Sequence, residues 1–187
     1  MTQMRTIESV PFAKDLAAAL AVPGTDAMRV AEDFFGLADL FKENTRLARA
    51  VTDPARSVAD KQGLASTAFA SHVTAATLSV VNAVVADHWR RPTDVDDALE
   101  VLGILSVLNA AGAKGALDQV REELFQVRYF LDHNREVRVR LSDISTGDSH
   151  ERGDLATSLF GSRVSVWTMR LYLASSRRSS RVQSILF

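Results

Sequence analysis

The sequence predicts an all-α protein. It contains only nine glycines and four prolines in 187 residues, which is little turn material for an all-β fold. Apolar residues recur at spacings of three and four, the period of a helix with one buried face. Only Arg138–Leu141 alternates like a strand, and four residues are too short a run to predict one.

The first two predicted helices are bounded by proline and glycine. Pro11 stands before a run of alanines and leucines, which are strong helix formers. Pro23-Gly24 ends that helix, and Thr25 is expected to cap the next one. The second helix has an apolar face made of Met28, Val30, Ala31, Phe34, Phe35, Leu37, Ala38 and Phe41.

Two further prolines mark expected helix starts. Asp53-Pro54 has the form of a cap followed by a first-turn proline. Pro92-Thr93-Asp94 has the same form and opens a helix that continues through Leu99, Leu102, Leu105 and Leu108. Gly112–Gly115 lacks the residue order of a phosphate-binding loop and is interpreted as the break after this helix.

An internal repeat organises the chain. Phe34-Phe35 through Thr52-Asp53 matches Leu124-Phe125 through Ser142-Asp143 at an offset of about 90 residues. Beyond the loop between Asp53 and Asp60 the offset increases by one, and Leu64, Phe69, Thr74 and Thr77 match Leu155, Phe160, Ser165 and Thr168. The repeat predicts two consecutive helical bundles, residues 1–93 and 94–187, with a junction near 91–97.

Charge and composition exclude several classes of function. Twenty-two Lys and Arg against 23 Asp and Glu leave a net charge of −1, so no overall field attracts nucleic acid. Arg177, Arg178 and Arg181 could contact phosphates, but an exposed polar turn explains them more simply. The longest apolar run, Val101–Ala113, falls short of the ~18 residues of a membrane span. We therefore expect neither nucleic-acid binding nor direct membrane insertion.

No group of residues indicates catalysis. The four histidines show no metal-ligand spacing, and the chain has no cysteine, so no metal site or cofactor is predicted. Adjacent acids such as Glu122-Glu123 point to different sides of a helix. Ser149-His150-Glu151 are neighbours in sequence, which seldom form a catalytic triad. A non-enzymatic role is expected.

Several predicted helices are apolar on more than one side. Between Val101 and Leu108, six residues cover most of a helix circumference. Such a helix either lies at the centre of the bundle or leaves one face for an amphipathic helix of a partner.

Five segments stand in a characteristic order along the chain: Phe12–Leu16, Thr52–Ser57, Ser71–Leu78, Leu117–Phe125 and Asn134–Arg138. Their order resembles that of the delta subunit of bacterial F-type ATP synthases, the counterpart of the mitochondrial oligomycin-sensitivity-conferring protein. The doubled bundle is similar to the longer actinobacterial form. Family members continue into a smaller C-terminal region that holds the b subunits, and this sequence stops at Phe187 without it.

The resemblance implies a non-catalytic stator subunit with a delta-type N-terminal bundle in each copy. Such a subunit lies peripherally at the cytoplasmic face of the cell membrane and binds the N-terminal helix of an alpha subunit between its first and fifth helices. It links the head to the b subunits of the peripheral stalk, so that proton-driven rotation is coupled to ATP synthesis. The alternative is a free-standing helical scaffold or regulator that binds another amphipathic helix. The expected groove residues are Phe12, Leu16, Leu78 and Val81 in the first copy and Leu102, Leu105, Met169 and Leu173 in the second.

Overall fold

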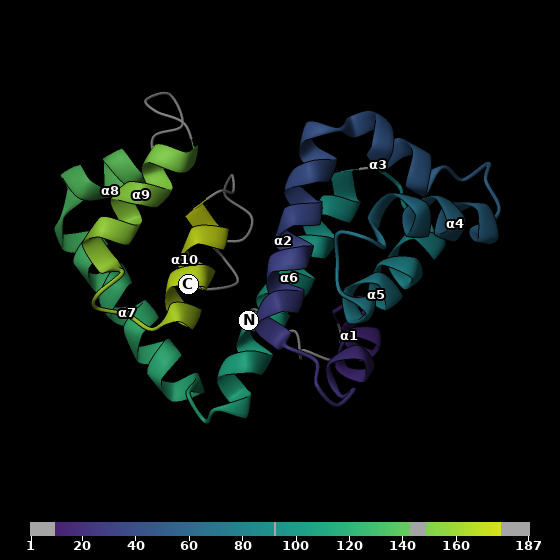
Figure 1. Ribbon diagram of the computed structural model, residues 1–187. Helices are drawn as coiled ribbons and strands as arrows, with labels where there is room; N and C mark the ends of the chain where they lie inside the picture. The colour runs from purple at the N-terminus through teal and green to yellow at the C-terminus, as the bar shows by residue number, and fades with distance from the viewer. Residues whose placement is uncertain (1–9, 92, 143–148, 177–187) are drawn as a thin grey trace, which may run out of the picture. The chain divides into compact units, whose positions relative to one another are not determined.

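Helices account for all the regular secondary structure in the described residues, as expected for the all-α class (Figure 1). The computed structural model describes residues 10–91, 93–142 and 149–176. Arg177, Arg178 and Arg181 lie outside this part of the chain, as do the side chains of Ser149 and His150. The helices are α1 (Ala13–Leu20), α2 (Ala27–Glu43), α3 (Thr45–Thr52), α4 (Val58–Phe69), α5 (Ala75–Ala86), α6 (Thr93–Ala113), α7 (Leu117–His133), α8 (Arg135–Ser142), α9 (Ser149–Phe160) and α10 (Val166–Ser176).

The cap of α2 is Asp26, and the prediction of Thr25 was wrong by one residue. The Asp26 carboxylate accepts hydrogen bonds from the backbone N–H of Met28 at 2.9 Å and of Arg29 at 3.3 Å. The Thr25 hydroxyl instead donates to the carbonyl of Ala19 at 3.4 Å, so it ties the turn back to α1. A carboxylate also complements the positive end of the helix dipole better than a hydroxyl does.

Asp53-Pro54 forms a turn and does not start a helix, contrary to the prediction. The backbone N–H of Arg56 donates to the Asp53 carbonyl at 3.1 Å, and the Asp53 carboxylate accepts from the N–H of Ala55 at 2.9 Å. These bonds close the turn locally. The next helix starts at Val58, where the Ser57 hydroxyl accepts from the N–H of Asp60 at 3.1 Å and caps it.

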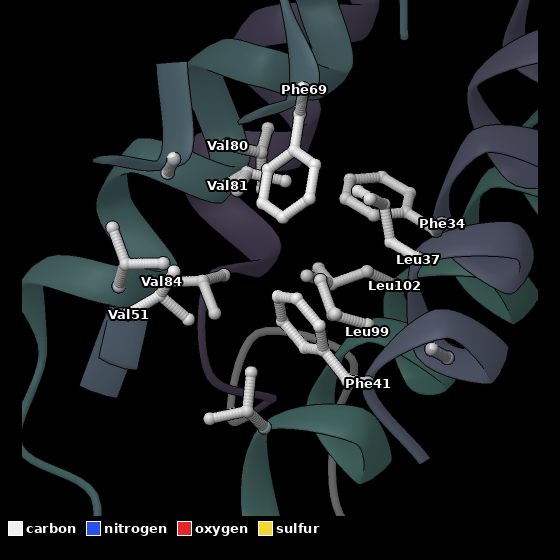
Figure 2. Close-up of a cluster of buried hydrophobic side chains, with 14 of the residues drawn as sticks. Phe34, Leu37, Phe41, Val51, Phe69, Val80, Val81, Val84, Leu99 and Leu102 are labelled. Atoms are coloured by element: carbon white, nitrogen blue, oxygen red, sulfur yellow. The ribbon is translucent and has the colours of Figure 1, made fainter. Parts of the chain in front are cut away.

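The chain divides into two compact units, residues 1–106 and 107–187. The first has a core to which α1 to α5 and the first part of α6 contribute. Figure 2 shows aromatic side chains of α2 and α4 converging with aliphatic side chains of α3, α5 and α6. The largest fully buried residues of this unit are Phe34, Phe41, Leu99, Leu102, Val30, Val51, Val80, Val81, Val84, Val85 and Val95.

A glycine allows α6 to approach α2 closely. A Cβ built on Gly103 would lie 2.7–3.0 Å from three ring atoms of Phe35, closer than Cβ atoms are found in proteins. The Phe35 ring is only 4% exposed, so it is held between the two helices. The same two helices are also joined by an ion pair between Lys42 of α2 and the buried Glu100 of α6.

The second unit has a smaller core of its own. Phe160 of α9 packs edge-on against Phe130 of α7, with ring centroids 5.7 Å apart, and against Tyr172 of α10 at 5.5 Å. Burial raises the pKa of Tyr172 to about 12, because the phenolate would be poorly solvated there. Val127, Leu141 and Ala156 complete the buried cluster.

The helices follow the spacing of the sequence repeat. α2 and α7 have the same length and start 90 positions apart, as do α3 and α8. α4 and α9 start 91 positions apart, and so do α5 and α10, which places the extra residue between α8 and α9. The boundary between the compact units lies inside α6, after Ser106, whereas the repeat was expected to begin at residue 94. Common descent of the two halves stays a prediction.

A carboxylate performs the same task in both halves. Asp33 of α2 accepts hydrogen bonds at the start of α5, from the N–H of Thr74 at 2.7 Å and the hydroxyl of Thr77 at 2.9 Å. Glu123 of α7 accepts from the N–H and hydroxyl of Ser165, at 2.8 and 2.7 Å, before α10. Each carboxylate thus joins two helices about 40 residues apart in sequence and satisfies donors that a helix start leaves unpaired.

Candidate partner-binding surface

Helices α1 and α5 pack side by side, the pair between which the first groove was expected. Leu16 of α1 and Val81 of α5 are buried in the core of the first unit. Phe12 and Leu78 are half-buried at its edge. The structure therefore brings the four expected residues of the first copy into one cluster, in which only Phe12 and Leu78 reach the surface.

Phe12 has an unusual backbone at the start of α1. Its φ of +62° lies in the left-handed region, which costs roughly 1–2 kcal/mol for a residue other than glycine. Its ring lies 5.9 Å from that of Trp89, between centroids. The Trp89 indole N–H donates to the carbonyl of Val84 at 2.7 Å, which anchors the indole at the end of α5. This aromatic pair closes one end of the α1–α5 surface.

The four residues expected to form the second groove belong to two different cores. Leu102 is fully buried in the core of the first unit, and Leu105 packs against the same core. Met169 and Leu173 of α10 pack against the core of the second unit. The apolar circumference between Val101 and Leu108 is thus explained in part by burial of α6 in the first unit.

The outer face of α7 in the second unit carries exposed aromatic rings. Phe125 is 59% exposed and Tyr129, one turn later, is 55% exposed. Phe35, which precedes Phe125 by 90 positions, is buried beneath Gly103 of α6 in the first unit. The Tyr129 ring stacks on His133 at 4.0 Å between centroids, which extends the exposed stripe by another turn.

A basic pocket that the sequence analysis did not find lies between α3 and the residues after α5. Its volume is about 510 Å³, and Trp89 forms part of its wall. Arg46 and Arg49 come from one turn of α3, for which the sequence analysis predicted no separate helix. Arg90 reaches the same pocket from a segment about 40 residues later.

The described residues also bear on metal binding and membrane crossing. Among the described residues, no three His, Asp or Glu side chains come close enough to hold a metal ion. None of the helices there combines the length and apolar character of a membrane span.

The amino-acid sequence is similar to those of ATP synthase delta subunits. No family model matches it. ATP synthase subunit delta of Kineococcus radiotolerans is 32% identical over 169 residues, which are 89% of this chain and 61% of that protein. The delta subunit of Corynebacterium diphtheriae is 32% identical over 160 residues, which are 85% of this chain and 59% of that protein. The delta subunit of a Parafrankia species is 33% identical over 167 residues, which are 89% of this chain and 60% of that protein.

Over 85–89% of its length the chain is a relative of ATP synthase delta subunits. It spans about three fifths of the length of these relatives.

Proposed function

We propose that this chain is a non-catalytic stator subunit of an F-type ATP synthase. Its relatives carry the name ATP synthase subunit delta, and this similarity is the observation that carries the proposal. The subunit would be peripheral at the cytoplasmic face of the cell membrane, as part of the synthase complex. By holding the catalytic head against rotation, it would let proton-driven torque produce ATP.

The proposed partner on the head is the amphipathic N-terminal helix of an alpha subunit. The α1–α5 surface supports this, because Phe12 and Leu78 present apolar edges beside a core that keeps both helices in place. Burial of apolar side chains contributes about 25 cal/mol per Å² before the cost of association, so a helix face of ordinary size can hold such a joint closed. Attachment to the b subunits of the peripheral stalk is the second half of the proposal.

Calorimetric titration with the N-terminal peptide of the ATP synthase alpha subunit from the same organism tests the proposal. We expect saturable binding that Leu78→Gln weakens about tenfold or more, since it removes an apolar contact from the half-buried edge of α5. Val58→Gln is the matched control, because Val58 is 48% exposed on α4 and should leave affinity unchanged. Circular dichroism establishes that both variants are folded.

Stoichiometry distinguishes one working surface from two. If the second half also binds, the titration reaches two peptides per chain, and Met169→Gln removes one of them. Absence of binding to the parent chain, or equal loss in Leu78→Gln and Val58→Gln, would refute the proposed docking.

A further inference from the structure

The pocket beside Trp89 has a strongly basic wall. Its lining residues include Arg46, Arg49 and Arg90, together with Trp89. The other lining residues are Ala50, Thr52, Asp53 and Pro54. The pocket thus combines three positive charges and one negative charge with an apolar surface.

The three arginines are not neutralised within the described part of the chain. Arg46, Arg49 and Arg90 form no ion pair there. The one carboxylate of the wall, Asp53, lies 3.8 Å from the guanidinium of Arg56. The single carboxylate among the lining residues thus has a partner in Arg56, which is not itself a lining residue.

A neighbouring arginine shows the contrast. The guanidinium of Arg91 lies 2.7 Å from the Asp94 carboxylate, and this hydrogen bond raises the pKa of Arg91. Arg90, next to it in the chain, faces the pocket instead. Three guanidinium groups around one concave wall repel each other and attract an anion, and a planar guanidinium matches a carboxylate with two parallel hydrogen bonds.

Trp89 connects this pocket with the α1–α5 surface. Trp89 is one of the lining residues, and its ring lies 5.9 Å, between centroids, from that of Phe12 at the start of α1. The hydrogen bond to the Val84 carbonyl holds the indole in this position. A partner segment that lies along α1 and α5 and continues past Phe12 would therefore bring its following residues to the arginines of the pocket.

We infer that the pocket of Arg46, Arg49, Trp89 and Arg90 binds carboxylates of acidic residues that flank the docked helix of the protein partner. This inference rests on the proposed function for the identity of the partner. The apolar surface of α1 and α5 would hold the helix, and the arginines would set its direction, since their pocket lies beside the Phe12–Trp89 pair at one end of that surface. Electrostatic complementarity of this kind contributes chiefly to specificity and association rate.

The pocket is tested without the partner by the fluorescence of Trp89. The chain has two tryptophans, so Trp167→Phe leaves Trp89 as the sole indole. We expect acetyl-Glu-Glu-Glu-amide to change its emission saturably, and the triple variant R46Q/R49Q/R90Q to abolish this change. Arg140→Gln, an exposed arginine of α8, is the control for the loss of charge. An equal response of the triple variant, or tighter binding of inorganic phosphate than of the peptide, would overturn the inference.

The second arm uses the alpha-subunit peptide and an analogue in which its acidic residues are replaced by glutamine. The arginine variants should weaken binding of the acidic peptide about tenfold or more and leave the analogue unaffected. Leu78→Gln should weaken both. If neither peptide binds the parent chain, the proposed docking of the alpha-subunit helix is refuted. The fluorescence titration of Trp89 then still shows whether the pocket binds carboxylates. If the arginine variants weaken both peptides equally, the recognition of carboxylates is refuted.

Discussion

Replacing Gly103 with alanine should destabilise the first unit, although alanine is the better helix former. A Cβ at this position would lie 2.7 Å from one ring carbon of Phe35 and 2.9 and 3.0 Å from two others. Because the ring is 4% exposed, it has no open space into which it can swing. Either α6 moves away from α2 or the ring shifts within the core, and both disturb packing.

The expected magnitude is a balance of two effects. Alanine in place of glycine inside a helix is favourable by about 1 kcal/mol. Overpacking a core typically costs about 1–3 kcal/mol. We therefore expect a net loss of about 1 kcal/mol for Gly103→Ala. Gly36→Ala on α2 is the matched control, because nothing lies within 4 Å of its added Cβ, and it should stabilise by about 1 kcal/mol.

Urea unfolding measures this difference. Emission of Trp89 in a Trp167→Phe background reports on the first unit, and helical circular dichroism reports on the whole chain. Phe35→Leu should relieve the clash, so its combination with Gly103→Ala should be less than additive. If Gly103→Ala stabilises as much as Gly36→Ala does, the close approach of α2 and α6 is refuted.

Three further outcomes follow from burial and pKa. In urea unfolding, Phe35→Ala should lower the free energy of unfolding by about 3–5 kcal/mol and Phe125→Ala by less than about 0.5 kcal/mol, because Phe35 is buried and Phe125 is exposed. Equal losses would contradict the exposure of Phe125. Burial acts to raise the pKa of Glu123, but hydrogen bonds from Thr168 and Ser165 outweigh it and the pKa is lowered. Glu123→Gln should therefore be less stable than the parent chain at pH 7, and the difference should shrink as the pH falls below about 4; a gap independent of pH would disprove this. Since the pKa of Tyr172 is raised to about 12, the contribution of its neutral side chain to stability should be lost as the pH rises from about 10 to 12. The melting temperature of Tyr172→Phe should therefore fall less over this pH range than that of the parent chain. Parallel losses in both chains would argue against that burial.

The candidate site was only partly foreseeable. Phe12, Leu16, Leu78 and Val81 all belong to or pack against one apolar cluster, while their part in binding a partner stays a prediction. Their division into buried and half-buried residues was not foreseeable, because the apolar stripe of a helix does not show how deeply each member is covered. The role of Trp89 was missed for a similar reason. Its contact with Phe12 joins residues 77 positions apart, and no local pattern announces such a pair.

The amino-acid sequence alone determined the helical class and several helix limits, since helix propensity, capping and proline positions act over a few residues. The start of α6 at Thr93 and its break near Gly115 follow from such signals. Tertiary structure decided which core Leu105 joins. It also decided that arginines about 40 positions apart share one pocket, because the packing of α3 against α4 and α5 brings their segments together and local signals carry no information about contacts at that separation.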